Sequence, residues 1–173
     1  FIVSSNGQTN AKYNIANPDD YLTLVKKGFY LNDYEPKDLV ELDSEYVAPT
    51  CDHPQLRKVA AEALVKMIKD AKGMYLLLNS GYRSYEEQEK IYQETEQKYG
   101  GAYAAEYVAT PGASEHQTGL GIDMTSQSVV DKQRLVFGDT TEYKWVVENC
   151  AKYGFIVRFT EGTDGITGIS HEP

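Results

Sequence analysis

Two side chains of the kinds that bind zinc lie close together near the middle of the chain, His116 and Asp123. The stretch from residue 111 to residue 123 contains three glycines, so its backbone can form tight turns. Imidazole nitrogen and carboxylate oxygen are ordinary zinc ligands, and a catalytic zinc site uses three protein ligands and leaves a fourth position open. The pair is therefore a candidate metal site. On this evidence alone, a hydrogen-bonding loop histidine is the simpler interpretation of His116.

Further motifs surround this pair in a fixed order along the chain. Ser80-Gly81-Tyr82-Arg83-Ser84 precedes it, and the pair itself belongs to a Pro-Gly-x-Ser-Glu-His-Gln-Thr-Gly-x-x-x-Asp pattern. The chain then closes on Gly-Ile-Ser-His-Glu-Pro at residues 168–173. This ordered set closely resembles the zinc D-alanyl-D-alanine carboxypeptidases of the vancomycin-resistance type, the VanY-like members of peptidase family M15. The resemblance extends from about residue 56 to residue 173.

The resemblance implies a role for several residues. His116 and Asp123 match the first two zinc ligands of the family, and Zn²⁺ is the implied cofactor. Glu172 matches the catalytic general base, which would take a proton from the attacking water and pass it to the leaving amine. Arg83 matches the arginine that faces the substrate, where its planar fork of donors would hold an oxyanion or a terminal carboxylate.

The resemblance also places Gln88 and Ser114 in the substrate pocket. It gives no catalytic role to Glu115, which we expect to support the loop instead. Outside this resemblance, Arg83 would be interpreted as a surface ion-pairing residue. We interpret His53 as a surface or helix-capping residue.

The third zinc ligand of the family is the histidine that closes a Glu-Pro-Trp-His motif, and the sequence stops at Pro173. We expect this ligand just beyond that position, in a chain whose C-terminal end is incomplete; a cut protein or a defective site are the alternatives. His171 is a poor substitute, because it neighbours Glu172 and successive side chains on a strand point to opposite faces.

The predicted function is a zinc-dependent carboxypeptidase that removes the terminal D-alanine from peptidoglycan stem peptides. An L,D-carboxypeptidase, a D,D-dipeptidase or an endopeptidase on the same scaffold are alternatives, as is a non-catalytic cell-wall-binding relative. A serine peptidase of the penicillin-binding type needs Ser-x-x-Lys, and no serine here has lysine three positions later. The substrate implies an extracellular or cell-wall-associated bacterial protein, which a segment outside this chain would anchor to the membrane.

The helices and strands predicted around these residues indicate an α+β domain. Apolar residues recur every three or four positions from Leu56 to Ala71, which predicts a helix that starts near Pro54 and stops at Gly73. Further predicted helices span 84–99, with a capping box of Ser84 and Glu87, then 102–109 and 141–153. Predicted strands span 74–80, 120–125, 155–159 and 166–171, the last two forming an antiparallel hairpin. The resemblance implies one small antiparallel sheet flanked by helices, with a zinc cleft of the hedgehog and D,D-peptidase type.

Length, charge and cysteine content set the remaining limits. The 173 residues suit a single domain, with residues 1–50 as a lead-in packed on a catalytic domain of residues 51–173. A net charge of −9 disfavours nucleic acid as a partner, and no apolar run is long enough to span a membrane. Cys51 and Cys150 form either one long-range disulfide or two separate thiols. The sequence does not indicate an oligomeric state.

Overall fold

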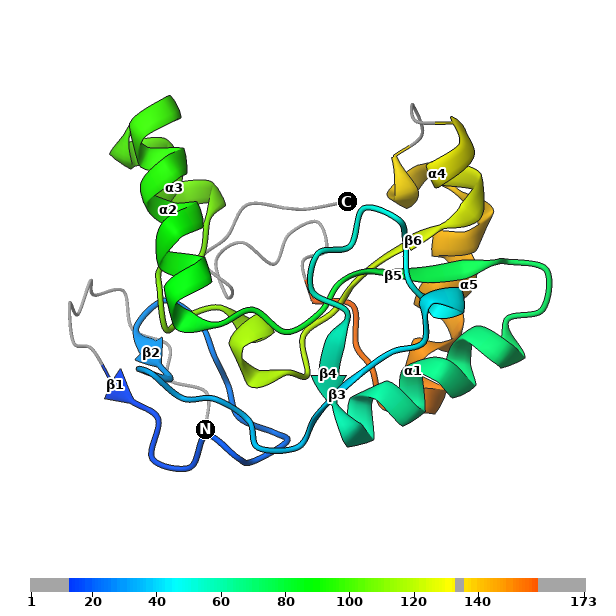
Figure 1. Cartoon of the computed structure of the whole chain (residues 1–173), viewed down its shortest axis with the longest axis horizontal. Coiled ribbons are helices and arrows are strands. Elements are labelled where there is room, and N and C mark those ends of the chain that lie inside the picture. The colour runs from blue at the N-terminus through cyan, green and yellow to red at the C-terminus, as the bar shows by residue number, and fades with distance from the viewer. Residues whose placement is uncertain (1–12, 133–135, 159–173) are drawn as a thin grey trace.

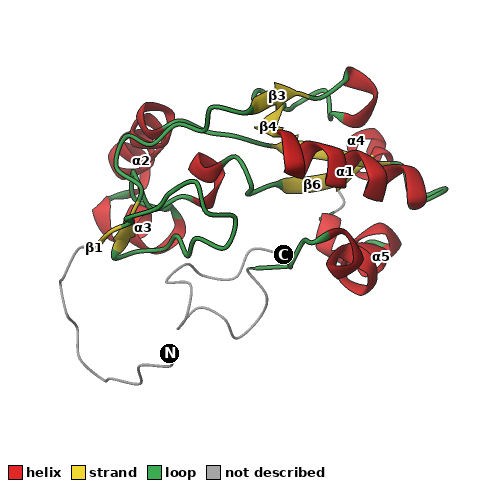
Figure 2. Cartoon of the chain, turned by 90° about the horizontal axis from the view of Figure 1, so that it is seen from below, coloured by secondary structure: helices red, strands yellow, loops and turns green. Residues whose placement is uncertain are grey.

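Helices and very short strands make up the part of the chain described by the computed structural model, residues 13–132 and 136–158. In these residues there are five α-helices and three two-stranded sheets. Helices α2 (Tyr85–Tyr99) and α3 (Gly101–Tyr107) lie together at one end of the molecule, whereas α1 (Lys58–Asp70), α4 (Gln127–Lys132) and α5 (Thr141–Asn149) lie at the other (Figures 1 and 2). The predicted mixed α and β fold is confirmed.

Strand β5 (Leu76–Ser80) pairs antiparallel with β6 (Asp123–Ser126), and this pair connects the two ends (Figure 1). Its apolar side chains pack against one face of α1 in a core that also takes in Val146 of α5 and Cys150 just after it. The large apolar side chains of this core with relative exposures of 1% or less are Leu56, Leu64, Met67, Leu76 and Leu78. Asp123 therefore belongs to a strand that is tied to the core.

Helix α1 confirms the helical periodicity but begins later than the sequence predicts. Gln55–Arg57 forms strand β4, which pairs antiparallel with β3 (Leu39–Glu41). Leu56 is fully buried on this strand, so its apolar character fitted the helical pattern equally well. A pairing partner from the lead-in, distant in sequence, decided between the two conformations.

Helix α2 begins with the predicted capping box. The Ser84 side chain accepts a hydrogen bond from the Glu87 amide, and the Glu87 carboxylate accepts one from the Ser84 amide. Two amides of the first turn are thereby satisfied, which fixes the point where the helix starts. Gly100, with φ of +93°, then separates α2 from the predicted short helix α3.

The other predicted helices and strands are found only in part. The predicted strand 120–125 is present as β6, but Asp123 begins this strand instead of lying near its end. Helix α4 follows β6 directly and was not predicted. The helix predicted over 141–153 is α5 followed by a 3₁₀ turn (Cys150–Tyr153). Residues 155–158 adopt no regular structure, and the rest of the predicted hairpin lies outside the described residues.

The lead-in contributes to the motif region. Strand β1 (Tyr13–Asn14) pairs parallel with β2 (Phe29–Tyr30), and the amide of Leu31 donates to the Gly112 carbonyl over 2.7 Å. The fully buried Gln117 donates from its side chain to the Asn32 carbonyl over 2.7 Å and to the Tyr34 carbonyl over 3.0 Å. The segment around residue 32 therefore braces the loop that carries His116.

The structure also bears on the pairing of the two cysteines and on membrane-spanning segments. Cys51 and Cys150 are both free thiols, so the structure contains no bond between them. Across the described residues, each helix is too short or too polar to cross a bilayer.

Candidate active site

The Ser80–Ser84 motif is a connection between β5 and α2 whose backbone bonds to two other segments. The Gly81 amide donates to the His53 carbonyl over 3.0 Å, and the Tyr82 amide donates to the Gln55 carbonyl over 2.7 Å. The next amide, that of Arg83, donates to the His116 carbonyl over 3.2 Å. The motif thus joins the β4 segment to the loop that bears the candidate metal ligand.

Glycine is required at position 81, because the backbone of another segment passes very close to its Cα atom. A Cβ atom there would lie 2.4 Å from the Gln55 carbonyl oxygen and 2.7 Å from that of His53. Both neighbours are backbone atoms fixed by hydrogen bonds, so they cannot rotate away as a side chain can. A larger residue would have to displace the segment itself.

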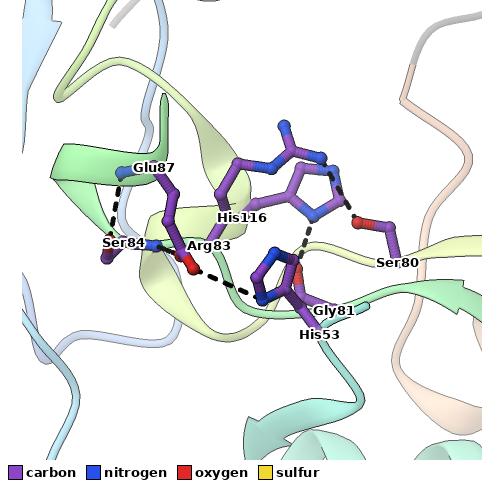
Figure 3. Close-up of polar contacts among 7 residues, drawn as sticks. All are labelled: His53, Ser80, Gly81, Arg83, Ser84, Glu87 and His116. Atoms are coloured by element: carbon purple, nitrogen blue, oxygen red, sulfur yellow. Dashed lines mark hydrogen bonds and ion pairs between the residues drawn. The ribbon is translucent and has the colours of Figure 1, made fainter. Parts of the chain in front are cut away.

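His116 has a fixed ring orientation. Its Nδ1 lies 2.7 Å from the Gly81 carbonyl oxygen (Figure 3). A carbonyl oxygen only accepts, so Nδ1 must carry the proton, and in the neutral ring Nε2 is left with a free lone pair. A hydrogen bond of this kind is what sets ring orientation and basicity in metal-binding histidines.

Asp123 meets that free nitrogen. Its Oδ2 atom is 3.4 Å from His116 Nε2. Two ligand atoms bound at about 2.1 Å to a tetrahedral zinc ion are themselves roughly 3.4 Å apart. The two groups are both acceptors when the imidazole is neutral, so the arrangement is favourable only with a cation or a proton between them. These residues therefore fit two of the ligands of a zinc ion.

The electrostatics of the site favour the charged form of Asp123. Burial acts to raise the pKa of this carboxyl group, but the hydrogen bond and positive charge of His116 in its protonated form, together with the charge of Arg83, outweigh it. The pKa of Asp123 therefore lies below its ordinary value, and the group is an anion at neutral pH. An anionic carboxylate is the form that binds a metal ion.

Arg83 lies beside His116 and is held by polar contacts, of which Figure 3 shows the one with Ser80. Its Nη1 donates to Gln88 Oε1 over 3.0 Å, and its Nη2 donates to Ser80 Oγ over 3.3 Å. Gln88 is only 1% exposed and donates in turn to the Ala109 carbonyl over 2.7 Å. The guanidinium Nε is buried and has no hydrogen-bond partner in the part of the chain that the structure describes. Arg83 thus keeps donor capacity for a further acceptor.

Ser114 and Glu115 immediately precede His116. Ser114 is buried, with 4% exposure. Glu115 forms an ion pair with Arg158, a contact between distant segments that the sequence does not predict. Burial raises the pKa of Glu115, although the positive charges of Arg158 and His116 act against this. The engagement of Glu115 with Arg158 agrees with a supporting role for this residue.

The remaining predicted site residues are Glu172, His171 and His53. Glu172 and His171 lie outside the described residues. Within residues 13–132 and 136–158, no three His, Cys, Asp or Glu side chains gather closely enough to hold a metal ion. His53, expected to be a surface or capping residue, is partly exposed, with its Nδ1 3.5 Å from Glu87 Oε1.

Comparison with known proteins adds family evidence to this geometry. The family model described as VanY, D-alanyl-D-alanine carboxypeptidase, matches residues 53–173. The chain belongs to this family. The matched region contains the Ser80–Ser84 motif, the candidate pair of His116 and Asp123, and Glu172, and it confirms the resemblance identified from the motifs.

Individual proteins similar to this VanY-family chain support the same family assignment. The protein YodJ of Bacillus subtilis (strain 168) is 42% identical over 163 residues, which cover 92% of this chain and 60% of YodJ. This chain therefore spans less than two thirds of the length of that relative. The structure of the LD-carboxypeptidase LdcB superposes with a TM-score of 0.84 at 40% identity, covering 96% of this chain and 80% of LdcB. A VanY D,D-pentapeptidase solved with Zn(II) superposes with a TM-score of 0.70 at 27% identity, covering 87% of this chain and 83% of the other.

Proposed function

We propose that this protein is a zinc-dependent carboxypeptidase that removes the terminal D-alanine from peptidoglycan stem peptides. The observation that carries the proposal is the pairing of His116 Nε2 with Asp123 Oδ2 at 3.4 Å, while Nδ1 is anchored on the Gly81 carbonyl. Membership of the VanY family and the Zn(II) complex of a VanY relative support the same function.

In this proposal, His116 and Asp123 supply two zinc ligands, and a histidine just beyond Pro173 supplies the third. When bound in such a site, zinc polarises the carbonyl to be cleaved and makes water a stronger acid. Glu172 accepts a proton from the attacking water and donates it to the departing amino group of D-alanine. Breaking the amide bond in this way yields a shortened peptide and free D-alanine, with water as the only co-reactant.

Arg83 supplies the positive charge that binds the substrate. Gln88 and Ser80 each occupy one terminal nitrogen of the guanidinium, which restricts the side chain to one orientation. From there it binds the terminal carboxylate of the peptide or the oxyanion that develops during cleavage. Gln88 contributes by positioning Arg83, and Ser114 lines the adjoining pocket.

A tetrapeptide substrate is a second candidate, which the similarity to the LD-carboxypeptidase LdcB favours. Both peptides end in D-alanine and differ in the residue before it, so the same residues would carry out either reaction. A D,D-dipeptidase or an endopeptidase would release a different product. A non-catalytic wall-binding relative would release none.

The test is to measure products from matched peptides with the full-length protein. We expect D-alanine release from a stem pentapeptide or tetrapeptide, loss of activity with a strong chelator, and recovery when zinc is added back. Exclusive release of the D-alanyl-D-alanine dipeptide would replace the proposal with a dipeptidase. Undiminished activity after complete removal of metal would refute a zinc mechanism.

The proposed substrate sets the place of action. Peptidoglycan lies outside the cytoplasmic membrane, so we propose an extracellular or cell-wall-associated bacterial protein, tethered by a segment beyond this chain. Protease protection of the protein on intact cells tests this location, because a protein outside the membrane is digested without lysis.

A further inference from the structure

Two neighbouring residues, His116 and Gln117, bond to parts of the chain that are distant from each other in sequence. The His116 ring contacts the Gly81 carbonyl, in the connection between β5 and α2. The Gln117 side chain donates instead to the Asn32 carbonyl over 2.7 Å and to the Tyr34 carbonyl over 3.0 Å, both in the lead-in. The short turn that carries the proposed zinc ligand is therefore attached to the lead-in as well as to that connection.

The contact of Gln117 with the lead-in requires an amide group. The side chain is 0% exposed, and its Oε1 is buried without a hydrogen-bond partner in the part of the chain that the structure describes. The two carbonyl acceptors fix the orientation of the amide, because the reversed amide would place Oε1 against both carbonyl oxygens. An apolar side chain of the same length would fill the space and break both bonds, which would leave the Asn32 and Tyr34 carbonyls without this donor.

The lead-in presents these carbonyls through an unusual backbone conformation. Asn32 has φ of +53°, in the left-handed region that residues other than glycine rarely adopt. Its side chain is exposed, so this residue contributes here through its backbone. The preceding Leu31 is 4% exposed, and its amide donates to the Gly112 carbonyl over 2.7 Å. The segment is thus held on the loop both before and at the carbonyl that Gln117 binds.

The lead-in also contacts the two ends of this loop. At the first end, a Cβ atom on Gly112 would lie 3.4 Å from the Asn32 amide nitrogen. At the other end, a Cβ atom on Gly119 would lie 3.0 Å from Leu39 Cδ2. The lead-in therefore approaches the loop closely on both sides of Gln117 in the sequence.

This attachment lies apart from the apolar core around α1. Leu31 is buried but does not belong to the core cluster that contains Leu64 and Val146. Loss of the Gln117 bonds should therefore act on the loop, whereas loss of core packing should lower stability without moving His116. The match to the family model begins at residue 53, so the attachment comes from a segment that precedes the matched region.

We propose that Gln117 is a positioning residue, which fixes the turn that presents His116 by binding the Asn32 and Tyr34 carbonyls. The inference rests on the proposed function, because it takes His116 as a zinc ligand. Attachment at two places restricts the imidazole before the metal binds, so less ordering is required on binding. The zinc affinity of the protein then depends on the conformation of the lead-in.

The test compares Gln117→Met with Leu64→Ala in the full-length protein. Methionine fills the buried position and has no N–H donor, whereas Leu64→Ala lowers stability from within the core. By competition with a chromophoric chelator, we expect the zinc Kd to rise at least about tenfold in Gln117→Met and to change less than about twofold in Leu64→Ala. In the metal-free protein, the NMR signals of the His116 ring should shift in the first variant and not in the second.

Two substitutions of Asn32 provide an independent test. Glycine adopts φ of +53° readily, so Asn32→Gly should keep the carbonyl in place. Valine is strongly disfavoured there, so Asn32→Val should displace the carbonyl. We expect zinc binding to be at least about fivefold weaker in Asn32→Val than in Asn32→Gly. Both variants retain Gln117, so this comparison decides the question even if Gln117→Met does not fold.

Three results would overturn the proposal. One is a Gln117→Met protein of lower stability that keeps the zinc affinity and the His116 ring signals of the unaltered protein, as a purely structural contact requires. Another is equal zinc affinity in Asn32→Gly and Asn32→Val. The third is equal weakening by Leu64→Ala and Gln117→Met, which would reflect general destabilisation. The ring signals are measured without metal, so they test the positioning separately from zinc binding and the proposed function.

Discussion

The exchange Gly81→Ala tests whether the Ser80–Ser84 connection positions His116, the proposed zinc ligand. The added Cβ would lie 2.4 Å from the Gln55 carbonyl oxygen, whereas ordinary contacts begin at 3.4 Å. Relief of this contact requires a displacement of about 1 Å, because both partners are backbone atoms that cannot rotate away. The Gly81 carbonyl moves with the segment, so its 2.7 Å contact with His116 Nδ1 is lost or lengthened.

The size of the effect follows from this contact. Loss of a hydrogen bond that orients a metal-binding histidine typically costs 10- to 100-fold in metal affinity or activity. We therefore expect the zinc dissociation constant of Gly81→Ala to rise by about 10- to 100-fold, and kcat/KM for D-alanine release to fall by roughly 100-fold, as for other displacements of about 1 Å. Overpacking should also lower the free energy of unfolding by about 1–3 kcal/mol.

Competition with a chromophoric chelator measures the zinc affinity, and urea denaturation measures the stability. Gly73→Ala is the matched control, since Gly73 has φ of +83° and its Cβ would meet nothing within 4 Å. It should reduce stability through backbone strain and leave zinc affinity unchanged. If Gly81→Ala binds zinc as tightly as the unaltered protein, the positioning role of this carbonyl is refuted.

Other substitutions probe the remaining parts of the site and the core. Arg83→Lys should lower kcat/KM by roughly 100- to 1000-fold with zinc content unchanged, because lysine lacks the planar fork; an unaltered rate would remove Arg83 from substrate binding. Glu172→Ala should retain zinc but lose turnover, and full turnover would end its assignment as general base. Leu64→Ala, at a side chain with 0% exposure, should cost about 3–5 kcal/mol in urea denaturation, whereas Val59→Ala, at 45% exposure, should cost under about 1 kcal/mol. Equal losses at the two positions would contradict the core placement of Leu64.

Local patterns predicted the main elements well. The capping box at Ser84 and the helices on either side of β5 involve contacts within a few residues, which short-range spacing can reveal. Strand β4 was mistaken for the first turn of α1, because a buried leucine satisfies both patterns and only pairing with β3 distinguishes them. The start of β6 at Asp123 was misplaced for a similar reason.

The sequence by itself determined which residue types are available for chemistry, the order of the motifs and the family to which they belong. Only the tertiary structure decided how those residues act on one another. The Gly81 carbonyl orients an imidazole 35 residues away, and Gln88 connects Arg83 to a carbonyl 21 residues from itself. Such contacts depend on distances between remote segments, which residue spacing along the chain does not specify.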